Sequence, residues 1–245
     1  MTLPRYIDIN ADLGEGFGIY RVCDDEQLIR YITSANIACG FHAGDYNIMN
    51  KMVELSKKYN VAIGAHISLP DLQGFGRRRI YFSPDEIKNI FLYQLGSLYA
   101  LAKNHNVKLQ HIKLHGFLYH LANEDKKVAQ TIADAIIKFD KNLIWIGFPQ
   151  SYQQELAREY NIKFAPEGFA DRGYDKNGKL LPRDRKGAII KSPKKVSLQV
   201  LKLISHHDIK TICIHSDTKG ALAIAKCVRK TLEKNNIHIK SLSNH

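Results

Sequence analysis

The sequence predicts an α/β fold, an irregular (β/α) TIM-like barrel with seven or eight strands. Three observations indicate it: short apolar runs alternate with helical segments, the runs are apolar throughout, and most of them end in polar clusters. Runs of this kind are typical of parallel strands that are covered on both faces. Because no low-complexity linker or sequence repeat divides the chain, we expect a single barrel domain over residues 1–245.

The first half of the chain supplies four of the expected strands, at about residues 6–11, 35–39, 61–66 and 109–114. Helices are predicted from Asp24 to about Thr33, from Asp45 onward, and from Ser83 to about Lys103. Ser83 precedes a proline and two acidic residues, which is the composition of a helix N-terminus. Residues 67–82, rich in glycine, proline and arginine, are expected to form a loop.

The second half continues the alternation. Strands are expected at about residues 142–147, 162–165, 210–215 and 237–239, and helices at about 124–138, 150–160, 193–205 and 218–233. Residues 166–190 form the longest stretch without a clear pattern, and they contain the turn sequence Asp175-Lys176-Asn177-Gly178. Loops of this length in a compact domain are usually functional or mobile.

Composition narrows the class of protein. No apolar run approaches the roughly 18 residues that a membrane span requires. The first residues lack the apolar core of a secretory signal, so we expect a cytoplasmic protein without a membrane partner. The four cysteines have no metal-site spacing and are interpreted as reduced thiols: Cys23, Cys39, Cys213 and Cys227.

The net charge of +12 makes a nucleic-acid-binding protein a candidate class. The basic residues, however, are spread along the chain, and few aromatic residues lie between them. A lysine-rich surface is therefore the simpler interpretation, and we expect no nucleic-acid partner.

Ionisable side chains gather where the apolar runs end. Because the carboxyl ends of parallel strands meet at one face, we expect these side chains to converge on one pocket. The candidates are Asp12, Glu15, His42, Asp45, His66, Lys113, His115, Asp171, Arg172, His215 and Asp217. Lys113 and His115 are two residues apart on a strand, so they point to the same side. The remaining histidines are expected at the surface or in packing roles: His105, His111, His206, His207 and His238.

These residue types indicate an enzyme. Imidazole titrates near neutrality and suits acid–base catalysis. The carboxylates of Asp12, Glu15 and Asp45 are candidate bases or magnesium ligands, although Asp45 could equally be only a helix N-cap. Lys113 and Arg172 are candidate binders of phosphate or carboxylate groups. A structural alternative also exists for the others, such as turn formation at Asp12 and Glu15 or a structural ion pair at Asp171 and Arg172.

A family resemblance runs through the same motifs. It is carried by Ile9-Asn10-Ala11-Asp12-Leu13-Gly14-Glu15-Gly16, residues 34–45, Gly64-Ala65-His66, Pro70-Asp71, Phe75-Gly76-Arg77, Lys113 with His115-Gly116, residues 169–174, Leu181-Pro182-Arg183, and His215 with Asp217. In these motifs, and in their order over nearly the whole chain, the sequence resembles the LamB/YcsF family. It differs from the family pattern at Leu114, where proline is usual, and at Ser216, where glycine is usual. Both differences concern loop geometry and leave the ionisable residues in place.

The resemblance implies an irregular barrel similar to glycoside hydrolases and deacetylases. It also implies the 5-oxoprolinase reaction, in which ATP hydrolysis drives the ring opening of 5-oxo-L-proline to L-glutamate. The co-substrate would be ATP with Mg²⁺, and the partners would be 5-oxoprolinase subunits B and C, so that the isolated chain should be weakly active or inactive. A homo-oligomer is also compatible with the sequence.

Residue by residue, the resemblance implies two groups. The catalytic group is Asp12, Glu15, His42, Asp45, His66, Lys113 and His115. The group that binds substrate or phosphate is Arg77, Glu167, Asp171, Arg172, His215 and Asp217. No phosphate-binding glycine motif or serine nucleophile motif is present, so spacing alone does not locate an ATP site.

Two other functions are compatible with the sequence. The first is a metal-dependent deacetylase or other amidohydrolase of the same barrel class, with a metal held by His42, Asp12 and His215. No closely spaced histidine pair supports that site, so the metal stays unassigned. The second is a basic module that binds RNA or acidic proteins. It would require its basic residues on one face, and salt-sensitive binding would identify it.

Overall fold

The computed structural model describes residues 6–206 and 208–244. Its strands are β1 (Tyr6–Leu13), β2 (Ser34–Ala38), β3 (Ala62–Ile67), β4 (Leu109–Leu114), β5 (Ile144–Gly147), β6 (Phe164–Phe169), β7 (Thr211–Ile214) and β8 (His238–Ile239). Its helices are α1 (Asp25–Leu28), α2 (Tyr46–Tyr59), α3 (Pro84–Asn104), α4 (Gly116–Glu124), α5 (Lys126–Asp140), α6 (Tyr152–Glu159), α7 (Pro193–His206) and α8 (Ala221–Lys234). The 3-10 turns η1 (Ile29–Tyr31) and η2 (Leu242–Asn244) complete the described elements.

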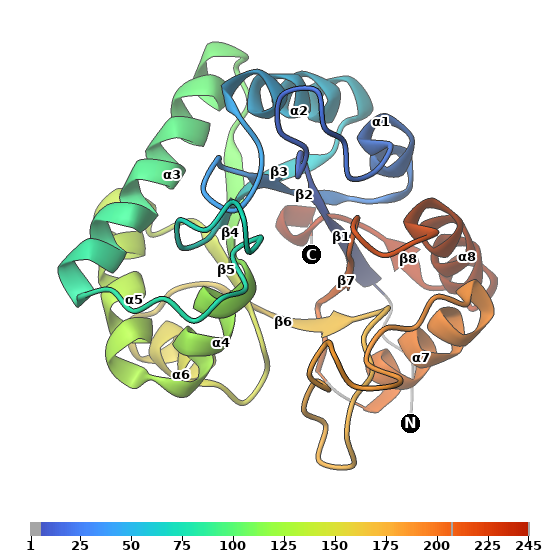
Figure 1. Ribbon diagram of the computed structural model, residues 1–245. Coiled ribbons are helices and arrows are strands. Elements are labelled where there is room, and N and C mark those ends of the chain that lie inside the picture. Colours follow the sequence, from blue (N-terminus) through green and yellow to red (C-terminus); the bar gives the residue numbers. More distant parts are fainter. Residues whose placement is uncertain (1–5, 207, 245) are drawn as a thin grey trace.

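Parallel strands close into a barrel. β1 to β7 pair in sequence order, and β1 closes the ring by pairing with both β2 and β7. The short β8 pairs with the first residues of β1, Tyr6 and Ile7. Figure 1 shows the helices arranged around the outside of the strands. The predicted irregular (β/α) barrel is therefore confirmed, with seven strands in the closed ring of the described residues.

The alternation of side chains along β1 explains its two environments. Ile7, Ile9 and Ala11 belong to the hydrophobic core, whereas Asp8 and Asn10 bond to polar side chains of neighbouring strands. Successive strand residues point to opposite faces, so one face packs on the helices and the other faces the barrel interior. The expectation of strands that are apolar throughout therefore fails for the interior of β1.

Capping side chains fix where several helices begin. Ser83 accepts a hydrogen bond from the backbone N–H of Glu86, whose side chain bonds back to Ser83, so α3 starts with a capping box. Asp45 caps α2, and Asp125 caps α5. The predicted helix starts at Ser83 and Asp45 are confirmed.

The structure corrects three predicted elements. The helix expected from Asp24 to Thr33 is only the short α1 followed by η1. Residues 116–124 form α4, which the sequence prediction missed because it placed a single helix over 124–138. The strand expected at 162–165 is β6, which extends to Phe169 and therefore includes Glu167. Pro166 and Gly168 disfavour strands in isolation, but pairing with β5 and β7 on either side overrides that preference.

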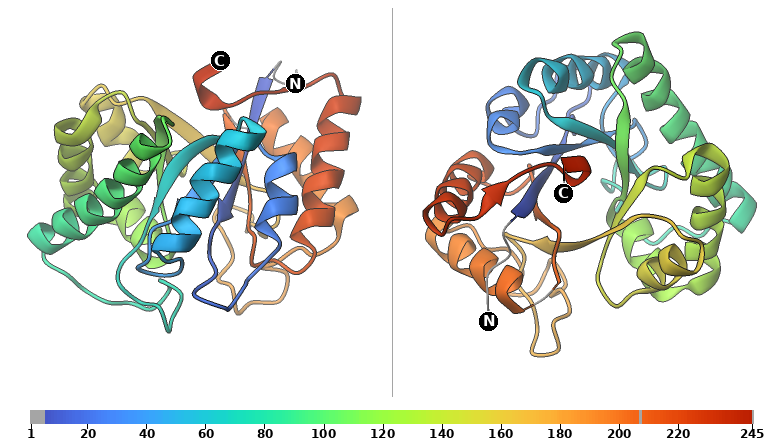
Figure 2. Two further views of the ribbon diagram at one scale, coloured as in Figure 1. Left: turned by 90° about the horizontal axis from the view of Figure 1, so that it is seen from above. Right: turned by 180° about the vertical axis from the view of Figure 1, so that it is seen from behind.

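The two ends of the barrel differ. In the left panel of Figure 2, the long loops after β1, β3 and β6 lie at the lower end, whereas β8 and η2 lie at the upper end. Strands β1 to β7 run toward the end that carries the long loops. This end is where the sequence analysis expects the site.

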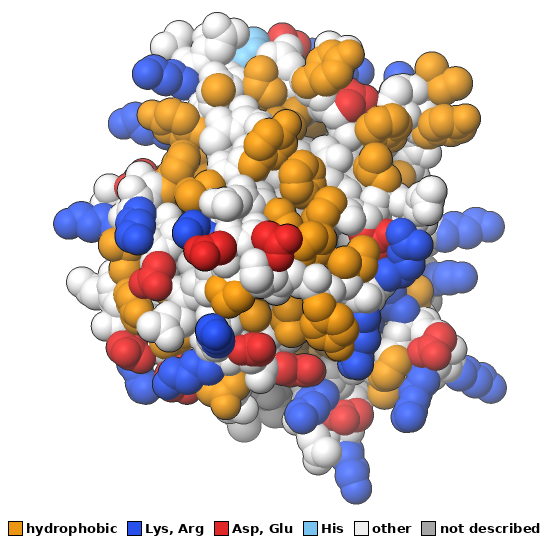
Figure 3. Space-filling model, turned by 60° about the vertical axis from the view of Figure 1, so that its left-hand side comes forward, with side chains coloured by type: hydrophobic (Ala, Val, Ile, Leu, Met, Phe, Trp, Pro, Cys, Tyr) orange, Lys and Arg blue, Asp and Glu red, His pale blue; other side chains and the backbone are white. Residues whose placement is uncertain are grey.

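The surface bears on the alternative functions. On the face in Figure 3, lysine and arginine side chains are separated by hydrophobic and acidic side chains. This face therefore lacks the continuous basic surface of a nucleic-acid-binding protein. Among the described residues, no helix has the length and apolar character needed to cross a membrane.

Candidate functional site

The strand ends bring most of the predicted side chains together. Asp12 comes from the end of β1 and Glu15 from the loop that follows it, while His42 comes from the loop after β2. His66 lies near the end of β3, and Lys113 and His115 lie at the end of β4. All six are nearly inaccessible to solvent, with no more than 5% of any residue exposed.

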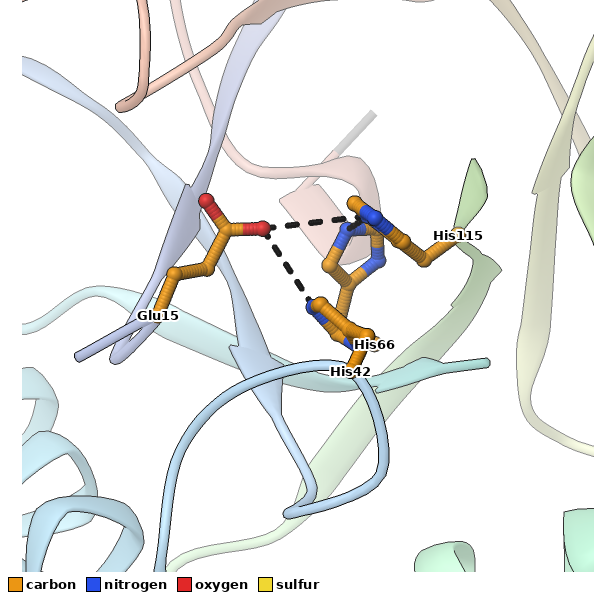
Figure 4. Close-up of side chains that lie close together, drawn as sticks. All are labelled: Glu15, His42, His66 and His115. Carbon is orange, nitrogen blue, oxygen red and sulfur yellow. Dashed lines mark hydrogen bonds and ion pairs between the residues drawn. The ribbon is translucent and has the colours of Figure 1, made fainter. Parts of the chain in front are cut away.

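Three histidines and a glutamate form a compact cluster (Figure 4). His42 Nε2 lies 3.3 Å from Glu15 Oε1, and His115 Nδ1 lies 3.7 Å from the same oxygen. His115 Nδ1 also lies 2.9 Å from His66 Nε2. The rings of His42 and His115 are stacked, with centroids 3.8 Å apart and planes 9° apart.

Burial governs protonation in this cluster. Burial lowers the pKa of His42 to about 3 and holds that of His115 well below its usual range, so both rings are neutral at pH 7. Burial, reinforced by the charge of Asp12, raises the pKa of Glu15 to about 7. The Oε2 atom of Glu15 accepts a hydrogen bond from Ser216 at 2.9 Å.

Lys113 lies deeper in the barrel, between carboxylates. Its Nζ atom lies 3.1 Å from Asp12 Oδ1 and 2.9 Å from Glu167 Oε1, and it contacts Cys213 Sγ at 2.9 Å. Burial opposes ionisation of both Lys113 and Asp12, but their opposite charges prevail. The pKa of Lys113 is raised well above its usual value. The pKa of Asp12, lowered by His66 and by Lys113, lies well below its usual value.

A carboxylate–histidine pair lies beside Asp12. His215 Nδ1 donates to Asp171 Oδ1 at 2.7 Å, and Thr218 Oγ1 donates to the other oxygen of Asp171. Burial opposes ionisation of Asp171, yet His215 and Thr218 keep its pKa below the usual value. The ligand atoms of Asp12, Cys213 and His215 all lie within 4.8 Å of one another.

Arginines surround Asp217 at the rim. Arg77 Nη2 lies 2.6 Å and Arg183 Nη1 3.3 Å from Asp217 Oδ2, and both arginine side chains are partly exposed. Arg172 instead donates to the carbonyl oxygens of Ala188 and Leu181, so it holds the loop after β6. Burial and the nearby Arg183 lower the pKa of Arg172 to about 10.

Asp45 does not join the cluster. Its Oδ1 atom accepts from the backbone N–H groups of Asn47 and Ile48, and its Oδ2 atom accepts from that of Gly18. The carboxylate is therefore occupied as the N-cap of α2 and as an anchor for the loop after β1.

The structure also adds residues that were not among the predicted site residues, although Asn10, Asn36 and Arg183 lie within the family motifs. Asn10 donates to Glu167 and Asn36 donates to Asp12, so both hold the interior carboxylates in place. Their positions along the chain could have identified them. Each lies on a predicted strand, two residues from another side chain that faces the barrel interior. Ser216, Thr218 and Arg183 belong to loops, and no spacing rule identifies their partners.

The expected metal-ligand set is also rearranged. The sequence grouped His42 with Asp12 and His215, whereas the structure places His42 with Glu15, His66 and His115, and Asp12 and His215 with Cys213. The loop after β2 carries His42 toward β4, which its position in the chain does not reveal. A cavity of about 700 Å³ lies elsewhere, beside α6 and the start of β6, and contacts none of these groups.

Comparisons with known proteins agree with this architecture. The family model described as LamB/YcsF matches residues 7–245. The A subunit of 5-oxoprolinase from Pyrococcus abyssi (strain GE5 / Orsay) is 42% identical, over 96% of this chain and 97% of that protein. The structure of the Lactam Utilization Protein from Thermus thermophilus has a TM-score of 0.91 at 34% identity, covering 97% of this chain and 100% of that one.

A more distant likeness extends to the fold alone. The catalytic domain of peptidoglycan N-acetylglucosamine deacetylase from Eubacterium rectale ATCC 33656 has a TM-score of 0.57 at 11% identity. It covers 97% of this chain and 88% of its own. The expected likeness of the barrel to deacetylases is thereby confirmed.

Proposed function

This chain belongs to the LamB/YcsF family, and on that basis we propose that it acts as the A subunit of 5-oxoprolinase in the hydrolysis of 5-oxo-L-proline to L-glutamate. The 42% identity to a relative of that name, over nearly the full length of both chains, supports the assignment. The observation that carries the chemistry is the buried pair of Asp171 and His215 beside Asp12 and Lys113.

The chemistry requires activation of a stable amide. The lactam carbonyl is a poor electrophile and its nitrogen a poor leaving group. Transfer of the terminal phosphoryl group of ATP to the amide oxygen releases ADP and makes the carbon electrophilic. Water then attacks that carbon, and the carbon–nitrogen bond breaks as the nitrogen gains a proton, which leaves an acyl phosphate. A second water hydrolyses the acyl phosphate to the free carboxylate and inorganic phosphate. The protein must therefore supply a base for water, an acid for nitrogen, and cations for phosphate.

His215 is the proposed proton carrier. Because its Nδ1–H donates to the ionised Asp171, Nε2 is the ring nitrogen that can accept a proton from water. The same nitrogen can return the proton to the departing amine. Asp171 acts as a positioning residue, since it fixes the tautomer and orientation of the ring.

The cationic groups suit an anionic substrate. Lys113 is the buried cation nearest to Asp12, and Arg77 and Arg183 present guanidinium groups at the rim. We assign the rim arginines to the phosphate groups of ATP, which enters with Mg²⁺. Glu167 and Asp217 then serve to hold Lys113 and the two arginines in place.

Partner subunits complete the proposal. The relative's name describes one subunit of an enzyme, and we propose that this chain works with subunits B and C in the cytoplasm, where ATP is available. The described site is closed, because His215 is only 7% exposed and Lys113 only 2%. Loop opening, driven by a partner or by substrate, would admit the lactam.

The test is release of glutamate and ADP from 5-oxo-L-proline, ATP and Mg²⁺, with the chain alone and with subunits B and C. We expect coupled release only in the mixture, reduced by roughly 10²- to 10⁴-fold by Asp171→Asn, which disturbs the histidine tautomer. Asp125→Ala, which removes only the cap of α5, is the matched control and should retain turnover. Absence of coupled release with three folded subunits would reject the function.

A metal-dependent amidohydrolase is the second candidate, because Glu15, His42, His66 and His115 could bind a metal ion. It predicts hydrolysis without ATP that a chelator abolishes. Turnover that requires ATP would exclude this alternative.

A further inference from the structure

We propose that Glu15, His66 and His115 bind one Zn²⁺ ion at the carboxyl end of the barrel. The proposal concerns the chain itself, so it can be tested whatever reaction the protein catalyses. It rests on the hydrogen bonds of the two histidines, on the ligand spacing and on the surrounding charges.

The first observation is that two ring nitrogens face each other at close range, while the other nitrogen of each ring faces a backbone carbonyl. His66 Nδ1 lies 3.3 Å from the backbone oxygen of Lys113, and His115 Nε2 lies 2.9 Å from that of Phe75. A carbonyl oxygen only accepts, so each of these nitrogens carries a proton. The opposite nitrogens, His66 Nε2 and His115 Nδ1, are only 2.9 Å apart, so either one proton or a bound cation must lie between them.

A bound cation resolves this contact. Metal-binding histidines usually donate their second ring N–H to a carbonyl or carboxylate, which fixes the tautomer and the ring orientation. His66 and His115 both have this arrangement, with backbone carbonyls as partners. Their other nitrogens therefore face a common point, as the nitrogens of two zinc ligands do.

The spacing also suits zinc. Ligands about 2.0–2.1 Å from a tetrahedral ion lie roughly 3.3 Å from one another. The distances from His115 Nδ1 are 2.9 Å to His66 Nε2 and 3.7 Å to Glu15 Oε1, which bracket that value. The rings of His66 and His115 are nearly perpendicular, at 88°, with centroids 4.8 Å apart. Small side-chain adjustments complete the coordination.

The surrounding charge favours a cation. Glu15 is anchored through Oε2 by Ser216, which leaves Oε1 directed at the histidines. Asp12 Oδ1 lies 3.4 Å from His66 Nε2, and the carboxylate of Glu167 lies deeper in the barrel. Among the described side chains that touch these three carboxylates, Lys113 is the one permanent cation. When all three are ionised, one ammonium group does not balance them, whereas an added divalent ion does.

His42 is placed beside the ion and is not counted as a ligand. Its ring is stacked on that of His115 at 9°, and the lone pairs of two parallel rings do not converge on one point. Three protein ligands leave one coordination position for water or a substrate oxygen, as in zinc sites that act as Lewis acids. Imidazole ligands favour Zn²⁺ over Mg²⁺, which separates this site from one for the magnesium of ATP.

The test is metal content. The full chain is stripped with a chelator, dialysed against Zn²⁺ or Mg²⁺ and analysed by mass spectrometry, with Co²⁺ as a spectroscopic probe. We expect one Zn²⁺ per chain, no retained Mg²⁺, and the visible absorption of tetrahedral Co²⁺. The variants His115→Gln and Glu15→Gln should weaken binding by more than about 100-fold, because even the outer partners of metal ligands are worth about 10- to 100-fold.

His105→Gln is the matched control, since His105 bonds to Asn50 outside the barrel, and it should retain the metal. Glu15→Gln keeps a partner for Ser216, so circular dichroism should show a folded protein even if His115→Gln is unstable. A folded wild-type chain that retains no Zn²⁺ would overturn the proposal and indicate a proton shared by His66 and His115. Equal zinc binding by wild type and Glu15→Gln would also overturn it.

Discussion

At the residue scale, the barrel interior is a polar network set by strand register. His111 is fully buried, and its Nε2 lies 2.8 Å from Asn36 Oδ1, whose amide group in turn donates to Asp12. His111 is therefore a packing residue, as expected, and it lies inside the barrel. His105 is partly exposed and His238 exposed, as expected, whereas His207 lies outside the described residues.

His111 predicts an acid dependence of stability. Burial, with Lys113 and His66 nearby, lowers its pKa to about 3, whereas the unfolded chain takes up the proton near pH 6.5. Its contribution is therefore fully present above pH 6.5 and is lost as the pH falls from there toward 3, by about 1.4 kcal/mol per pH unit. Urea unfolding of wild type and His111→Gln between pH 7 and 5 measures the difference. The variant should lose less stability over this interval, and parallel curves would contradict the assignment.

At the scale of elements, the strands and helices that position the site also depend on single residues for their own packing and capping. β3 approaches β4 so closely at Gly64 that a Cβ atom there would lie 2.2 Å from the ring of His111. α2 begins at Asp45, which also holds the loop that carries Glu15. Stability and site geometry are therefore coupled through these elements.

Two glycine substitutions distinguish the effect of side-chain packing on stability from the effect of backbone conformational preference. Gly64→Ala should destabilise the protein by about 1–3 kcal/mol, because the added methyl group overlaps His111 in a packed interior. Gly96→Ala in the middle of α3 meets no atom within 4 Å and should stabilise the protein by about 0.5–1 kcal/mol. Denaturant titration of both variants measures the changes. An unchanged free energy of unfolding for Gly64→Ala would mean that β3 and β4 are not this close.

Asp45→Ala tests whether this residue is structural. Loss of the N-cap should cost about 1 kcal/mol of stability, measured by thermal unfolding. In the complete enzyme, turnover should stay within a few-fold of wild type, because the carboxylate already accepts three backbone hydrogen bonds away from the cluster. A loss of turnover as large as that expected for Asp171→Asn would show that Asp45 takes part in catalysis.

At the scale of the whole molecule, the two ends of the barrel differ in role, one carrying the candidate site and the other being closed by the C-terminal segment. The ionisable cluster lies at the end with the long loops, while β8 and η2 lie at the other end (Figure 2). There Leu242 packs against Ile144, Ile146 and Ala165, and Ser243 accepts a hydrogen bond from Gln110. The C-terminal segment therefore closes the end of the barrel remote from the site.

Leu242→Asp should lower the free energy of unfolding by about 1–3 kcal/mol, because it places a charge against apolar side chains. Leu198→Asp is the matched control, since that leucine is 61% exposed on α7, and it should change stability by less than about 0.5 kcal/mol. Thermal unfolding distinguishes the two variants. Equal effects would show that η2 does not contribute to closure of the barrel.

The barrel class and the chemical character of the site could be predicted from the amino-acid sequence. Alternating strand and helix patterns, together with polar residues after Leu13, Ile67 and Ile214, were sufficient because both signals are local. The family motifs added the expectation of a particular reaction, which remains a proposal. Local signals failed at β6 and α4, where Pro166, Gly168 and Gly116 suggest breaks in regular structure, although tertiary pairing and packing stabilise these elements.

Which side chains meet was decided by the folded barrel. Register across β1, β3, β4 and β7 places Asp12 beside Lys113 and His66 beside His115, residues separated by about a hundred and about fifty positions. The loop after β2 brings His42 to His115, and the loop after β7 brings Ser216 to Glu15. These contacts depend on the stagger of strands in a closed barrel and on the paths of the loops. Neither can be predicted from the spacing of residues along the chain.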